Sequence, residues 1–137
     1  MIVESCTDES QIFTIPYAPV SFRIDLNGLD YELKEALTFK TFTEKRLSED
    51  KIGFSGILLV SDITASSIYA YDLCCPYEDS KSIKVDPLIG GKAKCNNCGS
   101  VFVTMYGLGT PESGPSNESL QMYNLTPLYP GVYQVSN

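Results

Sequence analysis

The residues best suited to chemistry in this sequence are cysteines. Four of the five cysteines lie in two short segments about twenty residues apart, Cys74-Cys75 and Cys95-Asn-Asn-Cys98. Two cysteine-bearing loops of this kind can converge on one metal ion or cluster. The sequence contains no histidine, which excludes His-based nucleophilic machinery, His general bases and His metal ligands. We therefore predict a metal site whose ligands are Cys thiolates, with carboxylate or Tyr phenolate as the remaining ligand types.

The size and charge of the chain limit the classes of protein that it can belong to. Its 137 residues are enough for one domain with a hydrophobic core, and a hydrophobic content of 43% fits a globular protein. A net charge of -7 and a pI near 4.4 oppose nucleic-acid binding, because binding to phosphates needs a cationic surface. No apolar run has the length of a membrane span.

The sequence contains many short strand patterns separated by turns rich in glycine and proline. This arrangement predicts an all-β sandwich or barrel. The segment 20–26 alternates apolar and polar residues, as a half-buried strand does, and Asn27-Gly28 is a turn signal. We predict that the segment 31–47 is rich in loops and contains short strands, and that 107–117 is a loop. The other predicted strands are 53–60, which is strongly apolar, and 67–72, 82–85, 100–105, 120–124 and 132–135.

The first residues predict a tether rather than part of the fold. We assign 1–14 to this tether and 15–137 to the β domain. The sequence around Cys6 resembles the end of a bacterial lipoprotein signal, with an acidic segment after the cysteine. The resemblance implies a lipidated Cys6, membrane contact only through that lipid anchor, and a periplasmic or outer-membrane location in the cell envelope. A frayed terminus with a free thiol is the alternative.

Three segments together resemble the Rieske [2Fe-2S] family. They are Asp72-Leu-Cys-Cys-Pro-Tyr, Lys94-Cys-Asn-Asn-Cys-Gly-Ser-Val-Phe and Thr110-Pro-Glu-Ser-Gly-Pro. In that family a Cys-x-His loop and a Cys-x-x-His-Gly-Ser loop bind the cluster, and a third loop ending in Gly-Pro covers it. The resemblance implies a Rieske-like β-sandwich or barrel, with residues 72–116 as a small metal-binding subdomain made of two cysteine loops.

The resemblance carries over to some ligand positions and not to others. Cys75 and Cys95 match the two family cysteines. Tyr77 and Cys98 stand where the two histidines belong, and Cys74 is an additional thiol. The family's defining ligation by two imidazoles is therefore absent. By the same resemblance, Gly99, Ser100 and Pro115 would surround the metal site without binding the metal directly.

Three occupants of the site remain open from the sequence. The first is a modified [2Fe-2S] cluster on Cys75, Cys95 and Cys98, with Cys74 or Tyr77 as the fourth ligand. The second is structural Zn²⁺ on the four thiolates, and the third is no metal, with disulfides instead. The first gives the function that we predict from the sequence, that of an electron-transfer protein with a redox protein partner. The other two predict a non-redox binding or structural module. Neither role is that of an enzyme, because the sequence offers no catalytic base.

Overall fold

The computed structural model describes residues 14–137. The predicted lipidation site at Cys6, and all but the last residue of the predicted tether 1–14, lie outside the described residues. No helix in the described part of the chain is long and apolar enough to cross a membrane.

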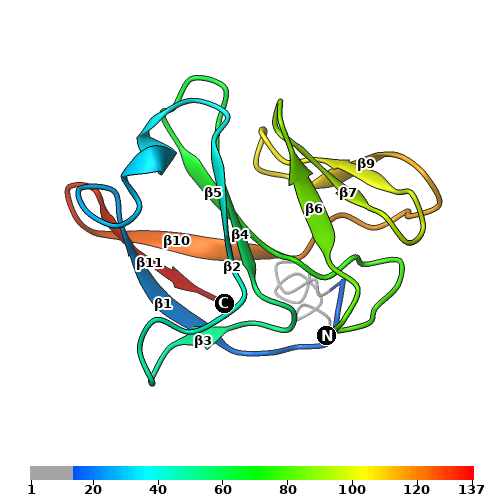
Figure 1. Cartoon of the computed structure of the whole chain (residues 1–137), viewed down its shortest axis with the longest axis horizontal. Coiled ribbons are helices and arrows are strands. Elements are labelled where there is room, and N and C mark those ends of the chain that lie inside the picture. Colours follow the sequence, from blue (N-terminus) through cyan, green and yellow to red (C-terminus); the bar gives the residue numbers. More distant parts are fainter. Residues whose placement is uncertain (1–13) are drawn as a thin grey trace, which may run out of the picture.

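The larger part of the fold is a seven-stranded antiparallel sheet that curls into a nearly closed barrel (Figure 1). Its strand order is β2-β4-β5-β10-β11-β1-β3. The strands are β1 (Val20–Asp25), β2 (Phe39–Phe42), β3 (Lys51–Ile52), β4 (Ile57–Ser61), β5 (Ile68–Asp72), β10 (Met122–Tyr129) and β11 (Val132–Ser136). This architecture confirms the prediction of an all-β protein.

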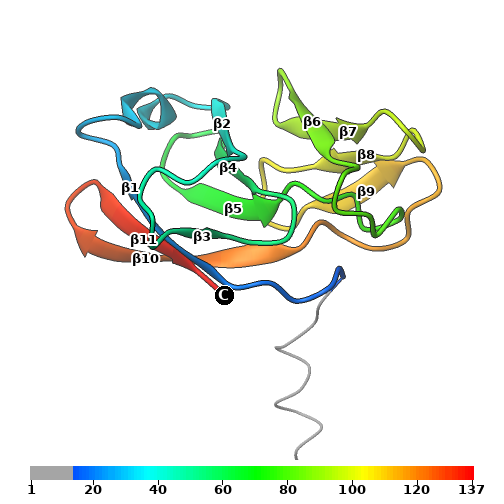
Figure 2. The same ribbon diagram turned by 60° about the horizontal axis from the view of Figure 1, so that its bottom comes forward.

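A second antiparallel sheet of four strands lies beside the first one in both views (Figures 1 and 2). Its strands follow each other in sequence order as β6 (Val85–Leu88), β7 (Lys92–Cys95), β8 (Val101–Val103) and β9 (Thr110–Ser113). All four strands fall within the predicted subdomain, residues 72–116. The chain leaves the larger sheet after β5 and returns to it at β10.

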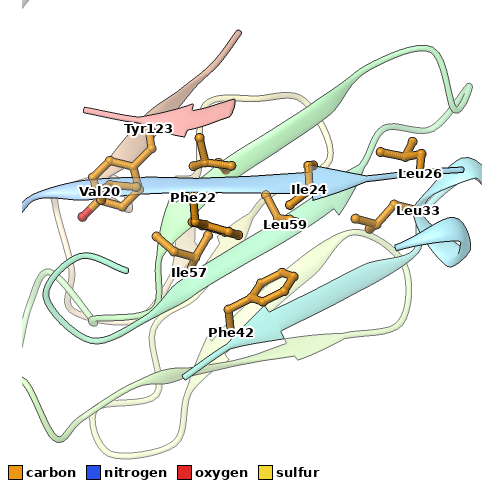
Figure 3. Close-up of a cluster of buried hydrophobic side chains, with 11 residues drawn as sticks. Val20, Phe22, Ile24, Leu26, Leu33, Phe42, Ile57, Leu59 and Tyr123 are labelled. Atoms are coloured by element: carbon orange, nitrogen blue, oxygen red, sulfur yellow. The ribbon is translucent and has the colours of Figure 1, made fainter. Parts of the chain in front are cut away.

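Strand β4 contributes to two hydrophobic cores because all five of its residues are buried. Ile57 and Leu59 face the core of the barrel, with Phe22 and Phe42 close by (Figure 3). Leu58 and Val60 have the opposite orientation, since successive side chains in a strand alternate. They join a second core, which also contains Leu73, Val85, Phe102, Leu120 and the cysteines Cys75 and Cys95. The strongly apolar segment at 53–60 thus corresponds to a strand buried on both faces.

The structure differs from the predicted elements in several places. The predicted strand 82–85 shares only Val85 with β6, and the two-residue strand β3 was not predicted. Residues Tyr31–Lys34 form a short 3₁₀ helix, η2, within the segment predicted as loop and short strands. Strand β7 was not predicted, because its buried residues, Ala93 and Cys95, include no large apolar side chain that would indicate a strand. The predicted loop 107–117 contains β9, which has Pro111 in the strand. Proline is tolerated there because β9 is the edge of its sheet.

The buried carboxylate of Asp72, at the end of β5, ties several segments together. Its Oδ2 atom accepts hydrogen bonds from the Tyr123 hydroxyl and the Phe54 N–H, both at 2.8 Å. Its Oδ1 atom accepts from the N–H groups of Ser55 at 3.1 Å and Cys74 at 2.8 Å. Burial raises the pKa of Asp72 in spite of these four donors. One side chain thereby fixes the β3–β4 turn, strand β10 and the start of the first cysteine loop.

Gly53 makes the close approach to this carboxylate possible. A Cβ atom at this position would lie 2.6 Å from Oδ2 of Asp72, and φ is +80°. Only glycine adopts this conformation without strain and leaves space for the carboxylate. Residues 53–56 form the turn around Asp72. The strand predicted at 53–60 therefore begins only at Ile57.

We expect Asp72→Ala to lower the free energy of unfolding by about 3 kcal/mol or more, because four hydrogen-bond donors lose their acceptor. Urea denaturation at neutral pH measures this change. Glu44→Ala removes the same charge from an exposed position and should change stability by less than about 0.5 kcal/mol. Equal effects of the two substitutions would contradict the structural role given to Asp72.

Candidate metal centre

Two loops at one end of the small sheet carry the candidate ligands. The first follows β5 and is closed by a hydrogen bond from the Cys75 N–H to the Ile83 carbonyl, at 3.1 Å. The second joins β7 to β8 and is closed by the Cys95 N–H, which donates to the Ser100 carbonyl at 2.8 Å. Strands β6 and β7 pair with Val85 opposite Cys95. This register places the end of the first loop beside the start of the second.

Three thiols from these loops form one group. The sulfur atoms of Cys75, Cys95 and Cys98 all lie within 4.8 Å of one another. The Sγ atoms of Cys75 and Cys98 are 3.7 Å apart, and the four cysteines in the described part of the chain are free thiols. A Zn–S bond of about 2.3 Å in a tetrahedron implies an S–S distance of about 3.8 Å. The group is therefore a possible metal site, and the distance between the sulfurs of Cys75 and Cys98 has the size expected around a single ion.

The environment gives the thiols different acidities in the metal-free protein. Cys75 is fully buried, and burial raises its pKa, although the N–H groups of Tyr77 and Glu78 oppose this effect. Cys98 is only partly buried. Burial by itself would raise the pKa of Cys98, but hydrogen bonds from the side chain and backbone of Ser100 lower it below the usual range. The thiol of Cys98 therefore loses its proton more easily than that of Cys75.

The structure does not bring Cys74 to this group. Its sulfur points the other way and lies 3.4 Å from the Ser80 carbonyl and 3.5 Å from the Cys75 carbonyl. Burial raises the pKa of Cys74 to about 11. The sulfur of the neighbouring Cys75 instead lies 3.7 Å from that of Cys98, so the two adjacent thiols have different surroundings. The geometry therefore gives no support to Cys74 as the fourth ligand.

Tyr77, the other predicted candidate for the fourth ligand, has an exposed side chain. The exposed fraction is 54%, and its phenol forms no hydrogen bond within residues 14–137. Tyrosine is a rare ligand that needs a fixed, deprotonated phenolate, and nothing around Tyr77 fixes it. The structure thus places neither predicted fourth ligand in the group of three thiols.

Ser100 lies next to the group of three thiols. It is fully buried, and its hydroxyl lies 3.3 Å from the sulfur of Cys98. The same oxygen accepts a hydrogen bond from the Ser116 N–H at 3.0 Å. Gly114 packs on the Ser100 backbone, where a Cβ atom would come within 2.4 Å of Cα. The segment 114–116 therefore supports the second cysteine loop through Ser100, whereas Pro115 itself is exposed.

Gly99 ends the second loop in the left-handed conformation, with φ of +83°, and its N–H donates to the Cys95 carbonyl at 2.8 Å. A turn of this kind bends the chain so that Cys95 and Cys98 point the same way. This is the local reason why a Cys-x-x-Cys sequence supplies two adjacent thiols.

One contact beside the thiols was missed by the interpretation of the sequence. Glu78 reads as solvated surface, yet its Oε2 atom accepts a hydrogen bond from the Asn97 side chain at 2.7 Å. Glu78 follows Cys75 at the same spacing at which Cys98 follows Cys95. That equal spacing was the available signal.

Comparisons with protein-family models, with curated proteins and with solved structures each returned no match. The resemblance to the Rieske family accordingly remains a hypothesis from sequence motifs, and the geometry of the thiols has to support any function proposed for the site.

We expect alkylation of the metal-free protein near neutral pH to modify Cys98 before Cys75 and Cys74, because thiolates react and buried thiols with raised pKa values do not. Peptide mass spectrometry after timed treatment with iodoacetamide gives the order. Ser100→Ala should slow the reaction of Cys98 by removing a donor to the thiolate. Modification of Cys75 as early as Cys98 would be inconsistent with these environments.

Proposed function

We propose that the protein is a non-enzymatic binding or structural domain in which Cys75, Cys95 and Cys98 hold one Zn²⁺ ion. The observation that carries this proposal is the set of three sulfur atoms within 4.8 Å of one another. Closed thiolate sites of tetrahedral size favour zinc, which needs no redox chemistry and adds its binding energy to folding. The ion would fasten the two loops to each other at one end of the small sheet.

The spacing of the sulfurs supports a single ion better than a two-iron cluster. In a Rieske cluster the two histidines bind one iron and the two cysteines bind the other. Cys75 matches a family cysteine and Cys98 stands at a histidine position, so the resemblance would place them on different irons. Their sulfurs are only 3.7 Å apart, which is the edge of a tetrahedron around a single ion. A [2Fe-2S] electron-transfer protein with a redox partner is therefore the second candidate, and it is retained because of the motifs.

We expect about one zinc per chain in protein purified without added metal, and no visible absorption. Cys98→Ser should lose the zinc and lower the melting temperature, since metal binding contributes to folding. Cys74→Ser is the matched control, because it changes a buried thiol next to the site but outside the group of three. It should keep the zinc.

Other results of the same measurement assign the site differently. Iron with inorganic sulfide and a coloured protein would replace the zinc proposal by electron transfer. A protein without metal whose cysteines are paired as disulfides would leave only the metal-free binding domain.

A cleft beside the first cysteine loop supports a binding role. It has a volume of about 550 Å³, and no acidic residue lines it. The lining includes four of the ten basic residues, namely Lys45, Lys51, Lys81 and Lys84. None of these four forms an ion pair within the described residues. In a chain with a net charge of -7, such a cluster favours an anionic ligand.

We expect inorganic tripolyphosphate to bind in this cleft with an affinity that falls as salt is added, since exposed charges are screened. The double variant Lys51→Gln/Lys81→Gln should weaken binding roughly tenfold. Arg23→Gln/Lys34→Gln removes the same charge from exposed positions outside the cleft and should have little effect. Isothermal titration calorimetry measures both. Equal weakening by the two double variants would show that net charge, and not the cleft, determines binding.

A further inference from the structure

The two cysteine loops are built on the same turn. In the first, the Asp79 N–H donates to the Cys75 carbonyl at 3.0 Å, and in the second the Gly99 N–H donates to the Cys95 carbonyl at 2.8 Å. Each loop is therefore closed between a cysteine and the fourth residue after it. Both closing residues have left-handed conformations, with φ of +56° at Asp79 and +83° at Gly99. A non-glycine residue rarely adopts this conformation, so the match at Asp79 indicates a conformation that the loop requires.

Corresponding positions in the two loops should present side chains in corresponding ways. In the second loop, the third residue after the first cysteine is Cys98, whose sulfur belongs to the group of three thiols. In the first loop, the residue in this position is Glu78. The loops thus form two half-sites of equal spacing, Cys95-x-x-Cys98 and Cys75-x-x-Glu78. The half-site of the first loop, Cys75-x-x-Glu78, ends in a carboxylate, which is a recognised ligand of zinc.

The side chain of Glu78 already lies against the opposite loop. Its Oε2 atom accepts a hydrogen bond from the Asn97 side-chain amide at 2.7 Å. Asn97 is the direct neighbour of Cys98, so this contact holds the carboxylate beside the loop that supplies two of the thiols. The Oε1 atom has no hydrogen-bond partner within residues 14–137. One oxygen is thereby oriented by Asn97, and the other remains available, as for many carboxylates that bind metals.

We propose that Glu78 is the fourth ligand of the ion and completes a site of three thiolates and one carboxylate. This inference rests on the proposed single-ion site. The carboxylate is outside the group of atoms within 4.8 Å of one another, so this proposal requires a rotation about the side-chain bonds of Glu78 when the ion binds. Cys74 points toward Ser80, and Tyr77 is exposed. Neither of them has a contact that directs it to the thiols.

X-ray absorption at the zinc edge tests the donor set directly. We expect three sulfur donors and one oxygen donor in the wild-type protein, and four sulfur donors in Glu78→Cys. Glu78→Gln should lower zinc affinity, measured by competition with a chelator, at least by the roughly tenfold to hundredfold that loss of an outer-shell partner costs. Asn97→Ala should lower it less, because the carboxylate remains. Tyr77→Phe is the control and should leave both the spectrum and the affinity unchanged.

The outcomes separate this inference from the proposed function. If the wild-type protein binds no zinc, the single-ion site fails and the assignment of Glu78 fails with it. If zinc binds with three sulfurs and one oxygen, but Glu78→Gln keeps the wild-type affinity, the oxygen comes from another group or from water, and only the assignment of Glu78 is overturned. Four sulfur donors in the wild-type protein would make a fourth cysteine the ligand in place of Glu78 and would likewise overturn it.

Discussion

The carboxylate of Asp72 is the constraint on which the arrangement of both sheets depends. It is fully buried, has no cationic partner within residues 14–137, and accepts hydrogen bonds from three backbone N–H groups and one phenol. A charge of this kind is tolerated in a protein interior only when its hydrogen-bonding capacity is filled. The requirement explains the glycine at position 53, the turn before β4 and the direction in which the chain leaves β5. The last of these matters most for the site, because the N–H of Cys74 is one of the four donors, and Cys75 follows it.

The three thiols lie where the second core meets the two cysteine loops. Cys75 and Cys95 are members of that core, whereas Cys98 is at its margin with partial access to solvent. An ion bound by these residues would add to packing that already joins the two sheets. The segment after Cys75 also supplies Lys81 and Lys84 to the basic cleft. Ligand binding in the cleft and metal binding in the loops therefore involve one continuous stretch of chain, which gives the two proposals a common structural basis.

The sequence was sufficient for the features that depend on local pattern. Alternating apolar residues and the glycine and proline turns between them predicted the all-β class and the strand around Leu58. The spacing of the cysteines predicted that Cys75, Cys95 and Cys98 converge. Strand β9 was missed, because a proline-bearing segment forms a strand only when a sheet edge is available to it. The position of Cys74 depends on the direction in which the backbone leaves β5, which Asp72 fixes through distant contacts. The spacing of Glu78 from Cys75 equals that of Cys98 from Cys95, but the contact of Glu78 with Asn97 becomes evident only when the two loops are seen in three dimensions.

The double role of β4 has a consequence for how the protein unfolds. Its five buried residues alternate between the core of the barrel and the core shared with the small sheet. Loss of this strand would remove side chains from both cores at once. Unfolding of the barrel would therefore also disrupt the packing of the small sheet. We therefore expect the two sheets to unfold together as one cooperative unit. The backbone amides of β4 should have among the slowest hydrogen exchange in the chain, with a protection that reports the stability of the whole domain.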